Sequence, residues 1–335
     1  MRAIALAVLG LAAALRCSAA PAADTPSYGP ELQGFEYPYP VKHFAFSSQG
    51  QSLTMAYMDV PPEDGAGNGR TAVLLHGKNF CGATWEHQIE SLTRAGWRVV
   101  APDQVGFCAS SKPPRYQYSF QQLAANTAAL LHGLGVERAT LVGHSTGGML
   151  AVRYALMYPQ AVERLVLANP IGLEDWKALG VPPRSVDEWY ARELKTSAEG
   201  IRDYERRTYY VGQWKPEYER WVDMLAGLNR GPGHESVAWN SALVYDMILT
   251  QPVVYEFPLI KVPTVLMIGT ADTTAIGSDV APPEVRARLG RYDVLGRQAA
   301  KAIPGAKLVE FPGFGHAPQI QAPEEFDRKL LEAIS

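Results

Sequence analysis

The chain has 335 residues, of which 47% are hydrophobic and 19% are charged, and its formal net charge is −3. This composition is typical of a globular protein and not of a disordered one. The small net charge gives no reason to expect a nucleic-acid partner. The length is enough for one large domain or for a domain that carries an insertion.

The N-terminus has the pattern of an export signal. Arg2 supplies a positive charge, residues 3–15 are apolar, and Ala20 and Ala22 satisfy the A-x-A rule for cleavage. We therefore expect a signal peptide over residues 1–22 and a secreted or periplasmic protein. The apolar stretch is too short to span a bilayer, so we expect no stable membrane insertion of the mature chain. An uncleaved interfacial anchor is the alternative.

Strands and helices are predicted to alternate along most of the rest of the chain. Residues 41–46 and 53–58 form a hairpin of two strands. From residue 71 onward, short apolar strands are expected at 71–75, 97–101, 139–142, 164–168, 264–268 and 307–311. The helices between and after them are expected at 85–94, 120–134, 146–158, 294–302 and 324–333. This alternation predicts an α/β fold, a mostly parallel sheet with helices on both faces.

One long segment interrupts the alternation. Residues 171–257 lie between two predicted core strands and are too long for a loop, so we expect an inserted helical cap. The α/β core would then consist of residues 23–170 and 258–335. The cap segment holds five of the seven Trp residues and seven of the 16 Tyr residues. We expect most of these aromatic side chains to pack inside the cap and the others to roof a pocket.

The sequence Gly143-His144-Ser145-Thr146-Gly147 stands between a predicted strand and a predicted helix. This is the G-x-S-x-G nucleophile elbow in the context that it requires, and it makes Ser145 the candidate nucleophile. Small residues beside the serine allow the tight turn from strand to helix. The helix that follows points its N-terminus at the negative charge that develops during attack. A structural glycine-rich turn is the alternative.

A serine nucleophile needs a base and a carboxylate that orients the base. His316 follows the last predicted strand in Gly313-Phe314-Gly315-His316, and Asp272 follows the strand at 264–268. The order Ser145, Asp272, His316 is the one expected of this strand arrangement. Three other carboxylates remain alternatives to Asp272: Glu174, Asp175 and, more weakly, Asp279.

The oxyanion hole needs two backbone N–H groups. One is expected from Thr146, directly after the nucleophile. The other is expected from the loop after the strand at 71–75, with Lys78 as first choice and Asn79 as second. The ammonium group of Lys78 has two interpretations, a solvated loop charge or a part of the substrate site.

These motifs together resemble the α/β-hydrolase superfamily. The resemblance rests on His76-Gly77, the run from Asp103 to Pro113, the elbow and the terminal Gly315-His316. It is strongest for the capped branch of esterases, enol-lactonases, carbon–carbon bond hydrolases, epoxide hydrolases and haloalkane dehalogenases. It implies an eight-stranded, mostly parallel sheet with a helical cap over the triad. A serine in place of an aspartate nucleophile argues against epoxide hydrolase and dehalogenase chemistry, and Cys108 stands where the family's loop usually carries Gly.

The expected reaction is hydrolysis of a carboxylic ester through an acyl-enzyme, with no metal and no organic cofactor. The aromatic cap favours an uncharged, apolar or aromatic small-molecule substrate. Hydrolysis of a lactone, an amide or a carbon–carbon bond, and perhydrolysis, remain alternatives because all can use the same triad. A non-catalytic binding protein of the same fold is the alternative from a different class.

A disulfide between Cys81 and Cys108 is the last expectation. Each cysteine lies five residues past a strand end, at His76 and Asp103, and in the fold that the chain resembles those strands are neighbours. Their loops would therefore emerge side by side, within reach of the Cα separation that a disulfide needs. Export would supply an oxidising compartment. Two buried, unpaired thiols are the alternative.

Overall fold

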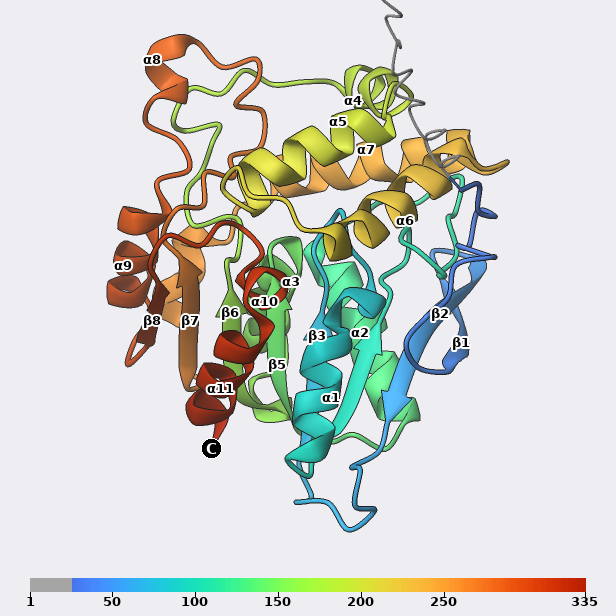
Figure 1. Ribbon diagram of the computed structural model, residues 1–335, viewed down its shortest axis with the longest axis vertical. Helices are drawn as coiled ribbons and strands as arrows, with labels where there is room; N and C mark the ends of the chain where they lie inside the picture. The colour runs from blue at the N-terminus through green and yellow to red at the C-terminus, as the bar shows by residue number, and fades with distance from the viewer. Residues whose placement is uncertain (1–25) are drawn as a thin grey trace, which may run out of the picture.

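The computed structural model describes residues 26–335, and the predicted signal peptide at 1–22 lies outside them (Figure 1). Its centre is one sheet of eight strands in the order β1-β2-β4-β3-β5-β6-β7-β8. Strand β2 is antiparallel to β1 and β4, and all other neighbours are parallel. The strands are β1 (Val41–Ser48), β2 (Gln51–Val60), β3 (Thr71–Leu75), β4 (Arg98–Pro102), β5 (Ala139–His144), β6 (Val162–Ala168), β7 (Thr264–Gly269) and β8 (Lys307–Phe311). The predicted mostly parallel, eight-stranded α/β fold is confirmed.

Helices cover both faces of the sheet. One face packs against α1 (Glu86–Arg94) and α11 (Pro323–Ile334), and the other against α2 (Phe120–Gly133), α3 (Thr146–Met157) and α9 (Tyr292–Ala302). Strands β5 and β7 are buried along their whole length. Their near-continuous apolar sequences follow from this burial, because a parallel strand with helices on both sides meets water on neither.

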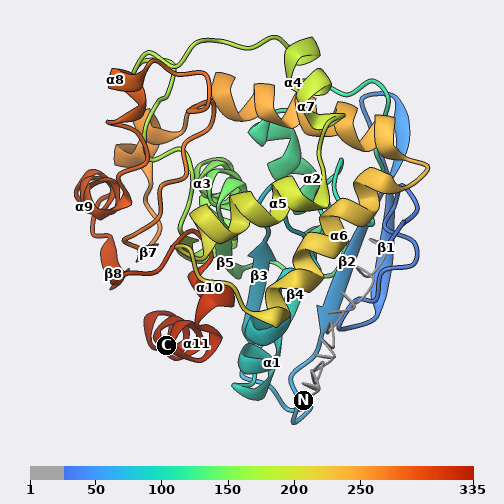
Figure 2. The ribbon, with the colours of Figure 1, turned by 45° about the horizontal axis from the view of Figure 1, so that its top comes forward.

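The predicted helical insertion lies between β6 and β7. It consists of α4 (Val186–Glu193), α5 (Ala198–Tyr204), the π-helix η3 (Glu205–Tyr209), η4 (Pro216–Tyr218), α6 (Glu219–Arg230), α7 (His234–Thr250) and η5 (Val254–Leu259). Figure 2 shows these helices lying across the carboxyl ends of the central strands. The exact cap boundaries at 171 and 257 stay a prediction. Short helices η1 (Gly82–Trp85), η2 (Pro159–Ala161), α8 (Pro283–Arg286) and α10 (Pro318–Gln321) complete the described chain.

The segment before β1 contacts helix α6 of the cap. The Tyr28 N–H donates to the Gly227 carbonyl at 2.9 Å, and a Cβ atom on Gly227 would lie 2.4 Å from the Tyr28 ring. Arg220 of α6 also donates to the Glu36 carbonyl at 3.0 Å. These contacts tie α6 to the N-terminal edge of the described chain. Among the described residues, no helix combines the length and apolar character needed to cross a membrane.

Candidate active site

Ser145 occupies a strained turn between β5 and α3. Its backbone angles are φ 55° and ψ −121°, in the left-handed half of φ space that a non-glycine residue adopts only at a cost of about 1–3 kcal/mol. The turn is closed by glycines: a Cβ atom on Gly143 would lie 2.3 Å from the Gly147 carbonyl oxygen, and one on Gly147 would lie 2.2 Å from the Leu75 carbonyl oxygen. Only glycine therefore allows the close approach that places the serine at the turn above the sheet.

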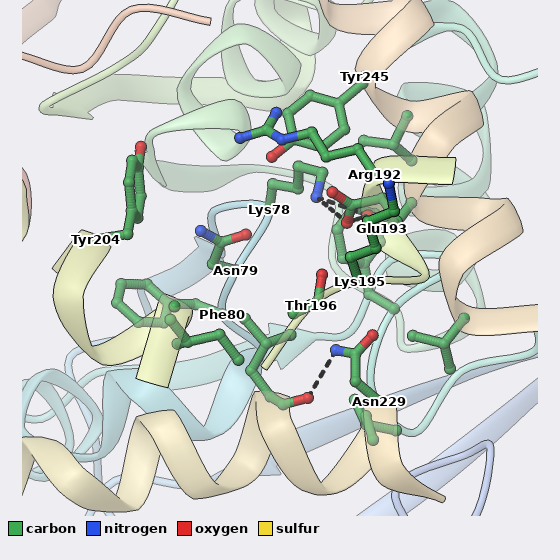
Figure 3. Close-up of a pocket in the computed structure, with 18 of the residues that line it drawn as sticks. Lys78, Asn79, Phe80, Arg192, Glu193, Lys195, Thr196, Tyr204, Asn229 and Tyr245 are labelled. Carbon is green, nitrogen blue, oxygen red and sulfur yellow. Dashed lines mark hydrogen bonds and ion pairs between the residues drawn. The ribbon is translucent and has the colours of Figure 1, made fainter. Parts of the chain in front are cut away.

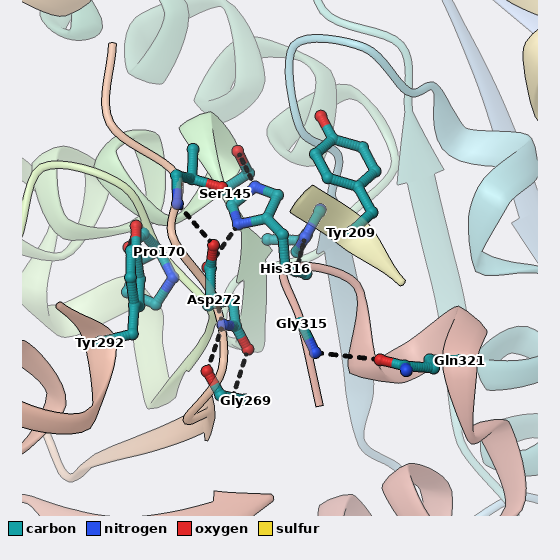
Figure 4. Close-up of polar contacts among 12 residues, drawn as sticks. Ser145, Pro170, Tyr209, Gly269, Asp272, Tyr292, Gly315, His316 and Gln321 are labelled. Atoms are coloured by element: carbon teal, nitrogen blue, oxygen red, sulfur yellow. Dashed lines mark hydrogen bonds and ion pairs between the residues drawn. The ribbon is translucent and has the colours of Figure 1, made fainter. Parts of the chain in front are cut away.

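His316 stands between the serine and a carboxylate (Figure 4). Its Nε2 atom is 2.9 Å from the Ser145 Oγ, and its Nδ1 atom is 2.6 Å from the Asp272 Oδ2. An Nδ1–H bond to the carboxylate leaves Nε2 as an acceptor for the serine proton. His316 and Asp272 are each only 1% exposed, so this chain of hydrogen bonds is shielded from water. The structure thus brings together the three residues predicted from the sequence.

The carboxylate of Asp272 is itself fixed by two donors. Asn169, directly after β6, donates its amide N–H to Asp272 Oδ2 at 2.9 Å, and the Thr274 N–H donates to Oδ1 at 2.8 Å. The Asn169 side-chain oxygen accepts the Gly269 N–H at 2.8 Å, which fixes the orientation of its amide group. The sequence analysis missed Asn169. A polar residue at the carboxyl end of a central parallel strand was the signal that marked it.

The alternative carboxylates have other partners. Glu174 accepts the Trp176 indole N–H at 3.0 Å and the Gly290 N–H at 2.9 Å. Asp175 accepts the Tyr255 hydroxyl at 3.0 Å. Asp279 pairs with Arg184, with 2.7 Å between nitrogen and oxygen. The hydrogen bonds of the described chain connect none of these three carboxylates to His316.

The two predicted oxyanion donors come from segments that both adjoin the nucleophile. Thr146 is the first residue of α3, so its N–H has no acceptor within that helix. The loop that carries Lys78 abuts the serine, since a Cβ atom on Gly77 would lie 2.9 Å from the Ser145 Cβ. His76 holds this loop: its Nε2 accepts the Gln104 N–H at 3.0 Å and its Nδ1 lies 2.9 Å from the Gly77 carbonyl. Burial lowers the pKa of His76, consistent with a neutral ring that donates once and accepts once.

The side chain of Lys78 extends into the cap. Its Nζ donates to the Ser241 hydroxyl of α7 at 2.6 Å and lies 3.4 Å from the Glu193 carboxylate of α4. The ammonium also lies 3.8 Å from the ring centroid of Tyr245. Burial lowers the pKa of Lys78, and the Glu193 carboxylate opposes that shift. The ammonium is therefore a buried link between the oxyanion loop and two cap helices, and the interpretation as a solvated charge is wrong.

A cavity of about 460 Å³ lies between the cap and the core, against the Lys78–Phe80 segment (Figure 3). Of the twelve cap aromatics, only Tyr204 and Tyr245 line it. Most of the others pack within the cap, as Trp189 does by stacking on Tyr245 with 4.3 Å between ring centroids. Most of the cap aromatics thus pack inside the cap, and two of them face the cavity.

The predicted disulfide is not formed. Cys81 and Cys108 are both buried free thiols, although their sulfur atoms and an Asp103 oxygen all lie within 4.8 Å of one another. The Cys81 thiol donates to the Met224 sulfur at 3.1 Å, and the Cys108 thiol is 3.6 Å from the Phe80 carbonyl oxygen. The two loops meet as expected, but side-chain packing directs each sulfur to another partner. Burial raises the pKa of Cys108 well above its usual range, which disfavours a reactive thiolate.

Comparison with known proteins agrees with this geometry. The alpha/beta hydrolase fold family matches residues 72–323, and the chain belongs to that family. The crystal structure of a probable hydrolytic enzyme from Pseudomonas aeruginosa PAO1 is 65% identical, covers 93% of this chain and 99% of its own, and superimposes with a TM-score of 0.92. An esterase from Exiguobacterium antarcticum, 20% identical with a TM-score of 0.65 over 84% of this chain and 96% of its own, shares the fold.

Curated relatives match over shorter regions. A 2-hydroxy-6-oxo-2,4-heptadienoate hydrolase from Pseudomonas putida is 36% identical over 182 residues, which are 48% of this chain and 66% of that protein. Bifunctional epoxide hydrolase 2 from Sus scrofa is 36% identical over 104 residues, 31% of this chain but only 19% of that protein. The chain thus spans less than two thirds of the length of the first curated relatives. Membership of the family shows that the protein is a hydrolase, but it does not identify the bond that the protein cleaves.

Proposed function

We propose that this hydrolase cleaves a carboxylic ester of a small molecule through an acyl-enzyme. The observation that carries the proposal is the pair of short bonds made by His316, 2.9 Å to the Ser145 hydroxyl and 2.6 Å to the Asp272 carboxylate. His316 accepts the serine proton as Oγ attacks the acyl carbon, and Asp272 stabilises the resulting imidazolium. The imidazolium then donates that proton to the departing alkoxide.

The second half of the cycle reverses these roles. Water donates a proton to the neutral His316 and attacks the acyl carbon, and Ser145 leaves with its proton restored. Through both steps, the N–H groups of Thr146 and Lys78 donate to the oxygen that becomes negatively charged. The strained backbone at Ser145 and the glycine contacts around it keep the nucleophile in place, so little reorganisation is needed during the reaction.

Carbon–carbon bond hydrolysis is the second candidate, favoured by the 36% identity with the heptadienoate hydrolase. A panel of p-nitrophenyl esters, lactones, anilides and a vinylogous β-diketone separates the candidates. Turnover of the esters, reduced to background in Ser145→Ala, supports the proposal. Turnover confined to the diketone favours the second candidate, and absence of all turnover together with absence of fluorophosphonate labelling favours a binding protein.

We also propose that the protein is exported, on the evidence of the N-terminal pattern alone. N-terminal sequencing of the protein recovered from the periplasm or medium should begin at Ala23. A chain that stays in the cytoplasm with residues 1–22 attached contradicts the proposal.

A further inference from the structure

The cavity under the cap is positively charged in a protein that is negative overall. The chain has a formal net charge of −3. Five cationic and two anionic side chains line the cavity: Lys78, Lys112, Arg192, Lys195 and Arg207 against Glu193 and Asp279. An excess of one sign of charge in a cleft with low-dielectric walls raises the local concentration of oppositely charged ligands. The lining therefore favours an anion.

Both carboxylates of the lining already have cationic partners. Glu193 lies 3.4 Å from the Lys78 ammonium and accepts the Ser241 hydroxyl at 2.5 Å. Asp279 lies 2.7 Å from the Arg184 guanidinium. Both carboxylates lie near enough to Arg192 to raise its pKa, but neither forms an ion pair with it.

Arg192 lies near two aromatic rings and has no acid of the described chain within ion-pair distance. Its guanidinium carbon lies 5.3 Å from the Trp189 ring centroid and 5.5 Å from that of Tyr245. No ion pair involves Arg192 within residues 26–335. Figure 3 shows its side chain beside Tyr245 and Lys78, at the edge of the open space. Without an ion-pair partner among the described residues, the planar guanidinium is available to bind the two oxygens of a carboxylate.

Apart from the charged residues and polar ones such as Asn79, Thr196 and Asn229, the lining has a large apolar part. It includes Phe80, Ile201, Met224, Leu228, Val237 and Val244. A ligand that matches both the cationic side chains and the apolar side chains of the lining has a hydrocarbon chain and one anionic end. This differs from the uncharged substrate that the aromatic content of the cap suggested, because most of those aromatic side chains do not reach the cavity.

We propose that the cavity, which borders the oxyanion loop beside Ser145 but is lined by no triad residue, binds the apolar chain of an ester that ends in a carboxylate, and that Arg192 binds this carboxylate. The inference rests on the proposed ester hydrolysis. It predicts that charge on the substrate raises kcat/KM, and that salt lowers kcat/KM for the charged substrate more than for a neutral one.

Two matched pairs of esters test the inference. In the first, mono-p-nitrophenyl suberate is compared with its methyl ester, so the carboxylate lies on the acyl side. In the second, 6-acetoxyhexanoate is compared with its methyl ester, so the carboxylate lies on the alcohol side. In at least one pair the charged member should have about tenfold higher kcat/KM, and Arg192→Gln should lower that charged-to-neutral ratio by about tenfold. Lys301→Gln, at an exposed position of α9, removes the same charge far along the chain and should leave the ratio unchanged.

The possible failures are distinct. If the esters are hydrolysed but neither pair shows a preference for the charged member, or Arg192→Gln leaves the ratio unaltered, anion recognition by Arg192 is wrong while ester hydrolysis stands. If no ester is hydrolysed above the Ser145→Ala background, the proposed function fails. Calorimetry of the same pairs with the Ser145→Ala variant then decides the inference alone, because it measures binding without turnover. Equal affinity for charged and neutral members overturns it.

Discussion

The ring of Tyr209 lies over the imidazole of His316, with 4.9 Å between the ring centroids and 38° between the ring planes. Tyr209 ends the π-helix η3 of the cap, and the neighbouring Thr208 carbonyl accepts the His316 N–H at 3.3 Å. Asn79, on the oxyanion loop, donates to the Tyr209 hydroxyl at 3.0 Å. One cap segment therefore contacts both the proposed base and the loop proposed to bind the oxyanion.

Removing the Tyr209 ring should loosen this contact. We expect Tyr209→Ala to lower kcat about tenfold or more and to cost about 3–5 kcal/mol of stability, because a buried aromatic side chain is replaced by a cavity. Tyr209→Phe keeps the stacking, loses only the bond to Asn79, and should retain most of kcat. Steady-state kinetics and thermal unfolding measure both quantities. Tyr255→Phe, at a side chain that is 65% exposed, is the matched control. Equal kcat in Tyr209→Ala and the wild type would show that the ring does not help position His316.

The triad makes a prediction about the order of effects. Ser145→Ala and His316→Ala should each lower kcat at least about a thousandfold, since nucleophile and base act as one unit. Asp272→Asn should lower it less, because the carboxylate orients and stabilises the histidine without touching the acyl carbon. Asp175→Asn is the control for the assignment of Asp272 as the carboxylate that orients His316. Near-normal turnover in Asp272→Asn, combined with a large loss in Asp175→Asn, would assign the acid to the loop after β6.

The elbow should not tolerate a methyl group at Gly147. A Cβ atom there would lie 2.2 Å from the Leu75 carbonyl oxygen, so strand and helix must separate. We expect Gly147→Ala to cost about 1–3 kcal/mol of stability and to lower kcat by displacing Ser145. Gly200→Ala, near the start of α5, meets only a side-chain atom at 3.3 Å and should be neutral or stabilising. Denaturant unfolding of the two variants measures the difference, and similar midpoints would contradict the steric argument.

Glu205 makes stability depend on pH. Its carboxyl is buried and has no hydrogen-bond partner within the described part of the chain, and burial raises its pKa from 4.5 to about 8, with Glu219 adding to the shift and Arg202 opposing it. The folded state therefore holds a proton that the unfolded chain releases near pH 4.5. The stability that the protonated Glu205 carboxyl contributes is fully present below pH 4.5 and is lost as pH rises through about 8.

The Glu205→Gln substitution keeps the shape of the side chain and removes its titratable carboxyl group. The variant should be more stable than the wild type at pH 8, and the difference should shrink toward pH 5. Thermal melts across this range measure it, with Glu199→Gln on the exposed side of α5 as control. A stability difference between Glu205→Gln and the wild type that does not change with pH would show that the buried carboxyl does not titrate in this window.

The sheet and the positions of Ser145, Asp272 and His316 were predictable because their signals are local. Apolar runs identify buried parallel strands, and functional residues follow strand ends in a fixed order. The direction of a side chain is not a local property. Burial of the Lys78 ammonium depends on helices more than a hundred residues away, and the Cys81 thiol turns to Met224 because the cap packs over it. Neither fact is encoded in the spacing of residues around these positions.

The central claim is that Ser145 becomes acylated during turnover, and rapid acid quench followed by peptide mass spectrometry tests it most directly. With a p-nitrophenyl ester in excess, we predict a burst of p-nitrophenolate and the mass of the acyl group on the peptide that contains Ser145. Both should be absent from Ser145→Ala, and the acyl group should accumulate in wild type when deacylation is slower than acylation. An acyl group on a different residue, or ester turnover that survives in Ser145→Ala at the wild-type rate, would contradict the account.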